Sequence, residues 1–196
     1  SSLSSVTFGK NSEFYTIGNY AFYGCYDLAS VDIPESITQI GSGAFAYCSS
    51  LSSVVIPDSV SAIPNEAFSN CSSLSSVTFG ENSKLESIGE EAFYKCYDLA
   101  SVVIPDSITQ IGNAAFAYCG SLRSVVIPDS VSAIPNEAFR NCYNLKEITI
   151  PGGVTDENLG DAAFKYCVSL GKVTFNRSTT SLVFDSTIQR EEDDTF

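Results

Sequence analysis

The chain has 196 residues, of which 44% are hydrophobic and only 17% are charged, so it can form one domain with a sizeable core. The sequence has ten Lys and Arg residues and 23 Asp and Glu residues, which gives a formal net charge of −13. This negative charge argues against nucleic acid as a partner. No apolar run reaches the roughly 20 residues of a spanning helix, so we expect no membrane insertion in this segment. The absence of His removes the commonest general base and metal ligand.

A repeat of 23 or 25 residues organises the chain. The pair Ala-Phe recurs seven times, from Ala21-Phe22 to Ala163-Phe164; each Phe is followed three residues later by Cys, and each Cys three residues later by Leu. Residues 21–68 are identical to residues 92–139 at 41 of 48 positions, which indicates that a block of three repeats was duplicated. We call each repeat a rung, and we predict a single domain of about seven rungs over residues 3–175.

The first elements can be predicted from the N-terminus. Leu3, Val6 and Phe8 occupy the strand positions of a rung whose Cys and Ala-Phe pair are missing, so this rung has no predecessor and no polar cap. The chain therefore starts inside a repeated unit, which is typical of a processed product or a piece of a longer protein. In a complete rung, the β-branched residues 54–56 before Pro57 predict a short strand, and residues 57–59 predict a turn.

Later in the rung, Pro64 followed by Glu66 predicts a short helical start. Other rungs have Gly where this one has Pro64, so we expect that Gly not to be left-handed. Rungs one, four and seven are two residues longer than the others, and we expect a small bulge just after their strands, as at 79–85. Residues 176–196 are predicted to be a C-terminal cap or a flexible acidic tail, in which 182–184 could form a terminal strand.

One rung cannot bury its own apolar residues, whereas a stack of rungs makes a continuous core. The predicted fold class is therefore a repeat solenoid. Each strand pairs in parallel with the strand of the next rung, about 4.8 Å away. The Leu, Val, Ile and Phe columns would run along the axis of the stack.

The motif Ile-Gly-x-x-Ala-Phe-x-x-Cys-x-x-Leu-x-x-Val-x-Ile-Pro stands nearly whole at residues 40–57 and 111–128. This pattern resembles the BspA-like, or treponemal-type, leucine-rich repeat. The resemblance implies a leucine-rich-repeat solenoid with a parallel β-sheet on the concave face and short helical or irregular segments on the other side. It also implies cell-surface or secreted proteins that bind host or matrix proteins.

If Val54 and Ile56 point inward, the residues between and before them point outward. The outward positions form two columns of small or β-branched residues with little charge, which suits a contact surface with a protein partner. Strand preference alone would also explain Thr and Val at these positions. The predicted partner-binding residues are Ser53, Val55, Ser76, Thr78, Ser101, Val103, Arg123, Ser124 and Val126.

Two further columns contain residue types that can bind metals. One Cys per rung, with an odd total of seven, does not make a disulfide framework, and a linear column cannot bring together three or four ligands. We expect a buried ladder of thiols, with no metal and no cofactor. The carboxylates Glu35, Asp58, Asp106 and Asp129 follow the Pro of their rungs and could either share Ca²⁺ in pairs or lie solvated in turns.

Eight Tyr residues flank the Cys column, and we favour packing against the core over a role in contacts. The resulting functional hypothesis is a non-enzymatic adhesion or recognition module at the cell surface or outside the cell. The alternative is a structural protein of a surface layer or larger complex, associating through the solenoid ends with another copy of itself. The localisation follows from the family resemblance.

Overall fold

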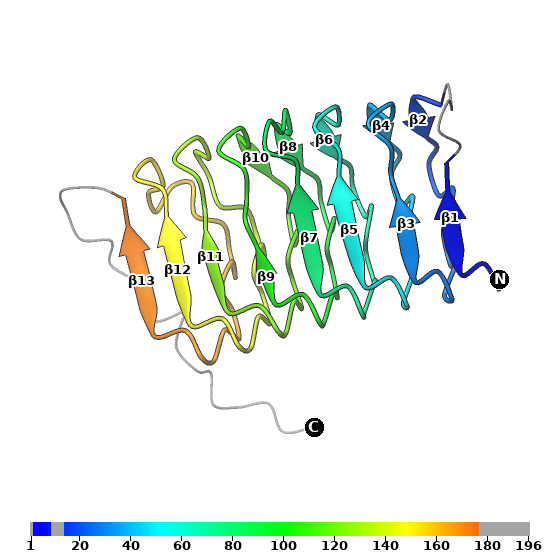
Figure 1. The fold of residues 1–196 in the computed structure, drawn as a ribbon. Helices are drawn as coiled ribbons and strands as arrows, with labels where there is room; N and C mark the ends of the chain where they lie inside the picture. The colour runs from blue at the N-terminus through cyan, green and yellow to red at the C-terminus, as the bar shows by residue number, and fades with distance from the viewer. Residues whose placement is uncertain (1, 9–13, 177–196) are drawn as a thin grey trace, which may run out of the picture.

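The structure is a computed structural model that describes residues 2–8 and 14–176. Its rungs stack into a regular succession of short parallel strands and turns, and no helix occurs in these residues (Figure 1). The fold is therefore a parallel β-solenoid, as the repeat predicts. The segment predicted to be a cap or tail lies outside the described residues, apart from Asn176.

The first side of the solenoid is a row of longer strands that run side by side (Figure 1). Most neighbouring strands pair in parallel at the same repeat position, as in Val54↔Val77 and Ile148↔Val173, whereas the second and third strands of the row, and the fifth and sixth, are not paired. We call the outer surface of this row the long-strand face. Its strands are β1 (Ser5–Thr7), β3 (Ser30–Asp32), β5 (Ser53–Ile56), β7 (Ser76–Phe79), β9 (Ser101–Val102), β11 (Ser124–Val126), β12 (Glu147–Ile150) and β13 (Lys172–Phe175).

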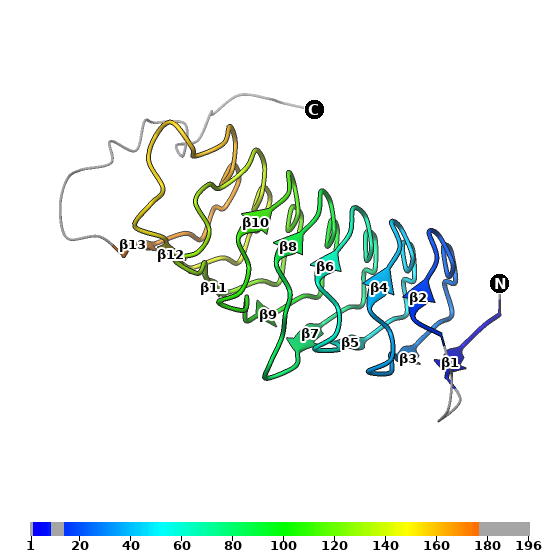
Figure 2. The ribbon, with the colours of Figure 1, turned by 90° about the horizontal axis from the view of Figure 1, so that it is seen from above.

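A second parallel ladder, absent from the sequence-based expectation, forms another side (Figure 2). Its strands have two residues each, the second being an Ile that points into the core. An isolated bridge between Ile134 and Leu159 extends the same ladder. The strands are β2 (Thr16–Ile17), β4 (Gln39–Ile40), β6 (Ala62–Ile63), β8 (Ser87–Ile88) and β10 (Gln110–Ile111).

The third side consists of turns, and the helical start predicted at Pro64 is wrong. Ala67 N–H donates to the carbonyl oxygen of Pro64, but Glu66 and Asn70 have φ values of 58° and 62°. A right-handed helix needs negative φ throughout, whereas positive φ at the third residue is what a type II turn requires. The corresponding two positions are left-handed in every complete rung, so the chain forms successive turns.

Backbone N–H groups in these turns donate hydrogen bonds alternately to the next rung and to their own rung. The N–H of Glu66, Phe68 and Asn70 donates forward to a carbonyl of the next rung. The N–H of Ala67, Ser69 and Cys71 donates instead to the carbonyl three residues back in the same rung. Since buried peptide groups need partners, this pattern offsets the cost of left-handed backbone at non-glycine residues.

The core lies between the three sides and is continuous from one rung to the next. A column of Phe rings runs along it, with centroids of Phe45 and Phe68 5.3 Å apart and planes within 1°. Five of these rings are fully buried. The prediction that buried columns follow the repeat is therefore confirmed.

The two-residue insertions differ between rungs. In rung four the extra residues form the turn from Gly80 to Ser83 directly after β7, as predicted. In rung seven the turn after β12 has the ordinary form, with Val154 N–H donating to the Pro151 carbonyl. The extra residues there come after Val154, where the Asn158 amide donates to the carbonyls of Ser132 and Gly153, 2.7 and 3.1 Å away. The insertion of rung one lies mostly outside the described residues.

Candidate functional site

The structure places the outward strand residues in register along the long-strand face. Ser53 pairs with Ser76 and Val55 with Thr78, while Ser76 pairs on its other side with Ser101. The alternation of each strand explains the exposure, because Val54, Val77, Val102 and Val125 fill the core from the same strands. Val103 is 82% exposed and Val126 62%, although both are apolar.

Charge is unevenly distributed over this face. Between β5 and β11 the outward strand residues are Ser, Thr or Val, and exposed Arg123 lies just before β11. Toward the C-terminal end, Glu147 and Lys172 form an ion pair of 3.0 Å. Asp32 occupies the outward position of β3. The nine residues predicted to bind a partner thus form one neutral central stretch with a single cation at its edge.

The Tyr residues contradict the packing role expected from the sequence. Tyr23, Tyr47 and Tyr166 are exposed, as are Tyr26, Tyr97 and Tyr143; only Tyr94 and Tyr118 are partly buried. The reason is that the inward direction of the turns is already taken by Ala, Phe and Cys. The Tyr rings contact each other across rungs instead, with Tyr94 and Tyr118 centroids 5.3 Å apart and Lys95 Nζ above both rings.

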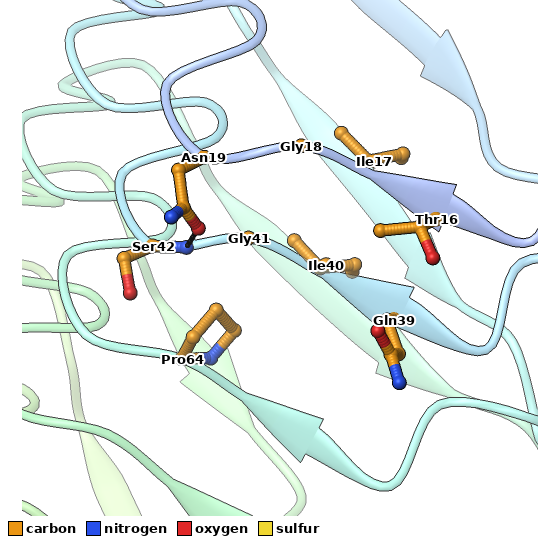
Figure 3. A pocket seen from close by; sticks show the side chains of 9 residues that line it. All are labelled: Thr16, Ile17, Gly18, Asn19, Gln39, Ile40, Gly41, Ser42 and Pro64. Atoms are coloured by element: carbon orange, nitrogen blue, oxygen red, sulfur yellow. Dashed lines mark hydrogen bonds between the residues drawn. The ribbon is translucent and has the colours of Figure 1, made fainter.

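The second ladder bears an open groove of about 370 Å³ that sequence reasoning missed (Figure 3). Its lining includes Gly18, Gly41 and Pro64, and Asn19 accepts a hydrogen bond of 2.9 Å from Ser42 N–H. A Cβ on Gly41 would collide with the backbone of Gly18 and Asn19, so the close approach of two rungs requires glycine there. A groove lined by corresponding residues recurs 71 positions later, at Ser87 to Pro135.

The lining of the first groove is uncharged and has no nucleophile beside a base. In the sequence, the groove is marked by the Gly that follows Ile in each rung. The sequence analysis predicts for this Gly only a φ angle that Pro can also adopt. That prediction is confirmed, because Gly18, Gly41, Gly89 and Gly112 all have φ outside the left-handed range. The lining of this groove can form hydrogen bonds and van der Waals contacts with a ligand, but it contains no side chain suited to acid–base chemistry.

The carboxylates that could have bound Ca²⁺ remain spread along the stack. Asp58 has one buried oxygen without a hydrogen-bond partner, and Asp129 accepts a 3.1 Å bond from the Asn176 amide. In the described residues, no three acidic, Cys or His side chains converge on one point.

The seven Cys residues are buried thiols, as predicted. The six thiols from Cys48 to Cys167 each donate a hydrogen bond to the carbonyl of the Phe 26 or 28 residues earlier, as Cys71 does to Phe45 at 3.1 Å. Burial raises the pKa of the Cys71, Cys96 and Cys142 thiols well above the usual range. These thiols stay protonated at neutral pH, so the ladder is a structural element.

The repeat geometry agrees with the comparisons with known proteins. A model of the BspA type leucine rich repeat region matches six copies over residues 1–119 and 82–187. The chain belongs to the BspA-type leucine-rich repeat family. Repeats of this family commonly act as protein-interaction modules, and its members are structural and binding proteins. No curated protein matches the chain significantly in sequence.

Several solved structures resemble this one. A leucine-rich repeat protein from Bacteroides ovatus is 38% identical over 87% of the chain, with a TM-score of 0.78. The leucine-rich repeat protein of T. pallidum is 33% identical over 80% of the chain and 71% of its own length, with a TM-score of 0.72. The chain spans 43% of the Bacteroides protein. The pneumococcal vaccine antigen PcpA, 23% identical over 89% of the chain and 42% of its own length, shares the fold with a TM-score of 0.57.

Within the described residues, no helix is long and apolar enough to cross a membrane.

This BspA-type chain presents two surfaces of different chemistry. The long-strand face is β-branched and neutral at its centre, whereas the turn side carries exposed Tyr together with basic and acidic residues. The first of these is the candidate functional site.

Proposed function

We propose that this chain is a protein-binding module of a cell-surface or secreted protein, used for adhesion or recognition. The observation that carries the proposal is the exposure of Val55, Val103 and Val126 in a neutral stretch of the long-strand face. Exposed apolar residues in register are typical of contact surfaces, and a stack of rungs offers many such contacts to one partner. The BspA-type repeat supports the cell-surface setting.

The charge of the molecule favours the same face. The formal net charge is −13, yet the outward residues of β5, β7, β9 and β11 are uncharged. Charged residues are depleted at the cores of protein interfaces because each buried charge must lose its water. Arg123 lies at the edge of the stretch, and Arg is one of the residue types enriched at binding hot spots. The partner we expect is a host or matrix protein.

The proposal is tested with the double substitution Val103→Glu and Val126→Glu. Both side chains face solvent, so the fold should persist, which circular dichroism and the unfolding midpoint would verify. Purified chain is first screened against an array of extracellular-matrix and serum proteins. For each protein that binds, the double variant should raise Kd at least tenfold, since two charges must then be desolvated at the interface.

The matched control is Gln39→Glu with Gln110→Glu. It adds the same two charges at exposed positions of the second ladder with almost no change in side-chain shape. The control should bind as the unchanged chain does. If the control loses binding while the long-strand variant keeps it, the partner contacts the second ladder and the proposed face is wrong.

A further inference from the structure

The two copies of the duplicated three-rung block differ on the turn side. Ser49 and Ser72 of the first copy correspond to Gly120 and Tyr143 of the second. Tyr97 occupies the same place in its rung as Tyr143, two rungs earlier, and Gly120 occupies that place in the rung between them. The second copy therefore carries a column of Tyr, Gly and Tyr where the first has Tyr, Ser and Ser.

Both rings of this column are accessible, although rungs lie on either side of them. Tyr97 and Tyr143 are each 45% exposed. A Cβ placed on Gly120 would lie 3.7 Å from Cδ2 of Tyr143 and 3.9 Å from the carbonyl oxygen of Tyr97. The Tyr143 ring thus lies beside Gly120, and no side chain rises between the two Tyr residues.

Hydrogen bonds between rungs hold the column in register. Ser121 N–H donates to the Tyr97 carbonyl at 3.0 Å, and the Asn144 amide donates to the Gly120 carbonyl at 2.7 Å. The backbone that carries the two Tyr rings is therefore fixed before any ligand binds, which lowers the cost of binding.

The spacing of the two Tyr residues matches a repeating ligand. In these rungs the centroids of successive Phe rings lie 5.4 Å apart, both from Phe93 to Phe116 and from Phe116 to Phe139. Two rungs therefore advance the stack by about twice that distance, in keeping with the regular spacing of parallel strands. This advance is close to the length of one disaccharide in an extended β-1,4-linked polysaccharide, in which every second sugar has the same orientation. Two such sugars can stack on Tyr97 and Tyr143 at once.

The chemistry beside the rings also suits a sugar chain. The face of an aromatic ring carries partial negative charge, which attracts the C–H groups on the face of a sugar ring. Asp98, Ser121 and Asn144 directly follow the three residues of the column, and Asp98 and Asn144 are exposed. A carboxylate, a hydroxyl and an amide together accept and donate the hydrogen bonds that sugar hydroxyls require.

The same neighbours favour a neutral sugar chain over other partners. Hot spots of protein interfaces are surrounded by contacts that exclude water, whereas the residues beside Tyr97 and Tyr143 are polar and accessible. The carboxylate of Asp98 would repel an acidic polysaccharide.

We propose that Tyr97, Gly120 and Tyr143 form a binding site for a neutral β-1,4-linked polysaccharide. The sugar chain runs along the stack, with one ring on each Tyr, and Asp98 and Asn144 bind its hydroxyls. The site lies on the turn side, apart from the long-strand face, so it adds a ligand class to the proposed function.

The test measures binding of cellohexaose and chitohexaose, both β-1,4-linked, by isothermal titration calorimetry, with α-1,4-linked maltohexaose for comparison. At least one β-1,4-linked hexamer should bind saturably. Maltohexaose should not bind, because its coiled chain does not repeat with the same spacing. Tyr143→Ser restores the residue found in the first copy and should raise Kd about tenfold, since one ring face is lost. Circular dichroism verifies that this variant is folded.

The matched control is Tyr26→Ser. Tyr26 has the place of Tyr97 in the first copy and is 53% exposed, but Ser72 follows it two rungs later, so this variant should bind as the unchanged chain does. The paired substitution Ser49→Gly with Ser72→Tyr should create a second site and double the stoichiometry.

Equal affinity of Tyr143→Ser and the unchanged chain, or equal binding of maltohexaose, overturns the proposal. If neither β-1,4-linked hexamer binds, while Tyr143→Ser weakens binding of a protein from the matrix and serum array, the column is a protein contact and the proposal is wrong. The variant Val103→Glu with Val126→Glu should leave binding of the hexamers unchanged. Failure of this site is therefore distinguishable from failure of the long-strand face.

Discussion

The Cys119 thiol donates a hydrogen bond to the main-chain oxygen of Phe93, 3.3 Å away across the boundary between two rungs. The same oxygen also accepts the N–H of Cys96 at 3.2 Å. One carbonyl thus closes a turn within its own rung and anchors the next rung. This double use explains why a small side chain with a weak donor suits the position.

Cys119→Ala should lower the free energy of unfolding by about 1–2 kcal/mol, because it removes the thiol donor and leaves a small cavity. The Phe93 carbonyl keeps its bond to Cys96, which limits the loss. Urea titration followed by circular dichroism measures the change. Cys119→Val fills the space without a donor and separates the two contributions. Unchanged stability of Cys119→Ala would show that the thiol bond contributes nothing.

The thiols should react slowly with a thiol reagent in the native protein at pH 8. All seven are buried, which blocks access of the reagent, and burial also holds the pKa of Cys71, Cys96 and Cys142 well above the usual range, so those three lack the reactive thiolate. In denaturant without reductant, about seven thiols should react, in accordance with the sequence count. A count below six would mean that a disulfide exists.

Stability should fall as the pH rises above about 8.5, where unfolded thiols ionise. Burial raises the pKa of Cys71, Cys96 and Cys142 in the folded state, so the folded chain retains protons that the unfolded chain loses. Each such thiol lowers the unfolding free energy by about 1.4 kcal/mol per pH unit between the two pKa values. The measurement is urea denaturation from pH 7 to 10. Cys96→Ala should flatten this dependence, and an equal slope in that variant would contradict the explanation.

Phe116→Ala should cost about 3–5 kcal/mol, as truncation of a buried aromatic residue does. Its ring stacks between Phe93 and Phe139, with centroids 5.4 Å from each. Phe164 stacks on Phe139 at 5.7 Å and is slightly exposed, so Phe164→Ala should cost less. Thermal denaturation of both variants compares them. Greater loss at Phe164 would contradict coupling between neighbouring rungs as the source of stability.

Glu66→Gly should stabilise the protein by about 1 kcal/mol, because residue 66 has φ of 58° and an exposed side chain. Removing the charge also relieves repulsion that, after burial, raises the pKa of Glu91. Glu66→Ala removes the same charge and retains the strained backbone, so it isolates the backbone effect. The converse variant, Gly43→Ala, should destabilise, since its Cβ would collide with the Tyr20 ring. The unfolding midpoints of the three variants are compared, and equal midpoints for Gly and Ala at residue 66 would refute the argument.

The order of the amino acids is enough to predict the stack, the core columns and the outward positions of the long strands. The repeat period can be read directly from the sequence, so Val54 and Val77 must occupy equivalent positions once the rungs align. Burial then follows from the alternation of side chains along a strand, and this alternation alone assigns Val103 and Val126 to the outer surface. The buried thiols follow from the same period, since one Cys per rung cannot converge with others.

Other features arise only from contact with the next rung. A two-residue strand such as Gln39–Ile40 has no period of its own, and it exists only because the neighbouring ladder supplies hydrogen bonds. The turns replace the expected helix at Pro64 for the same reason, because left-handed Glu66 donates its N–H to the following rung. The Tyr side chains point outward because Phe and Cys already fill the inward directions. These outcomes depend on contacts between residues 22 to 28 positions apart in the sequence. The conformational propensities of neighbouring residues do not predict contacts over that separation.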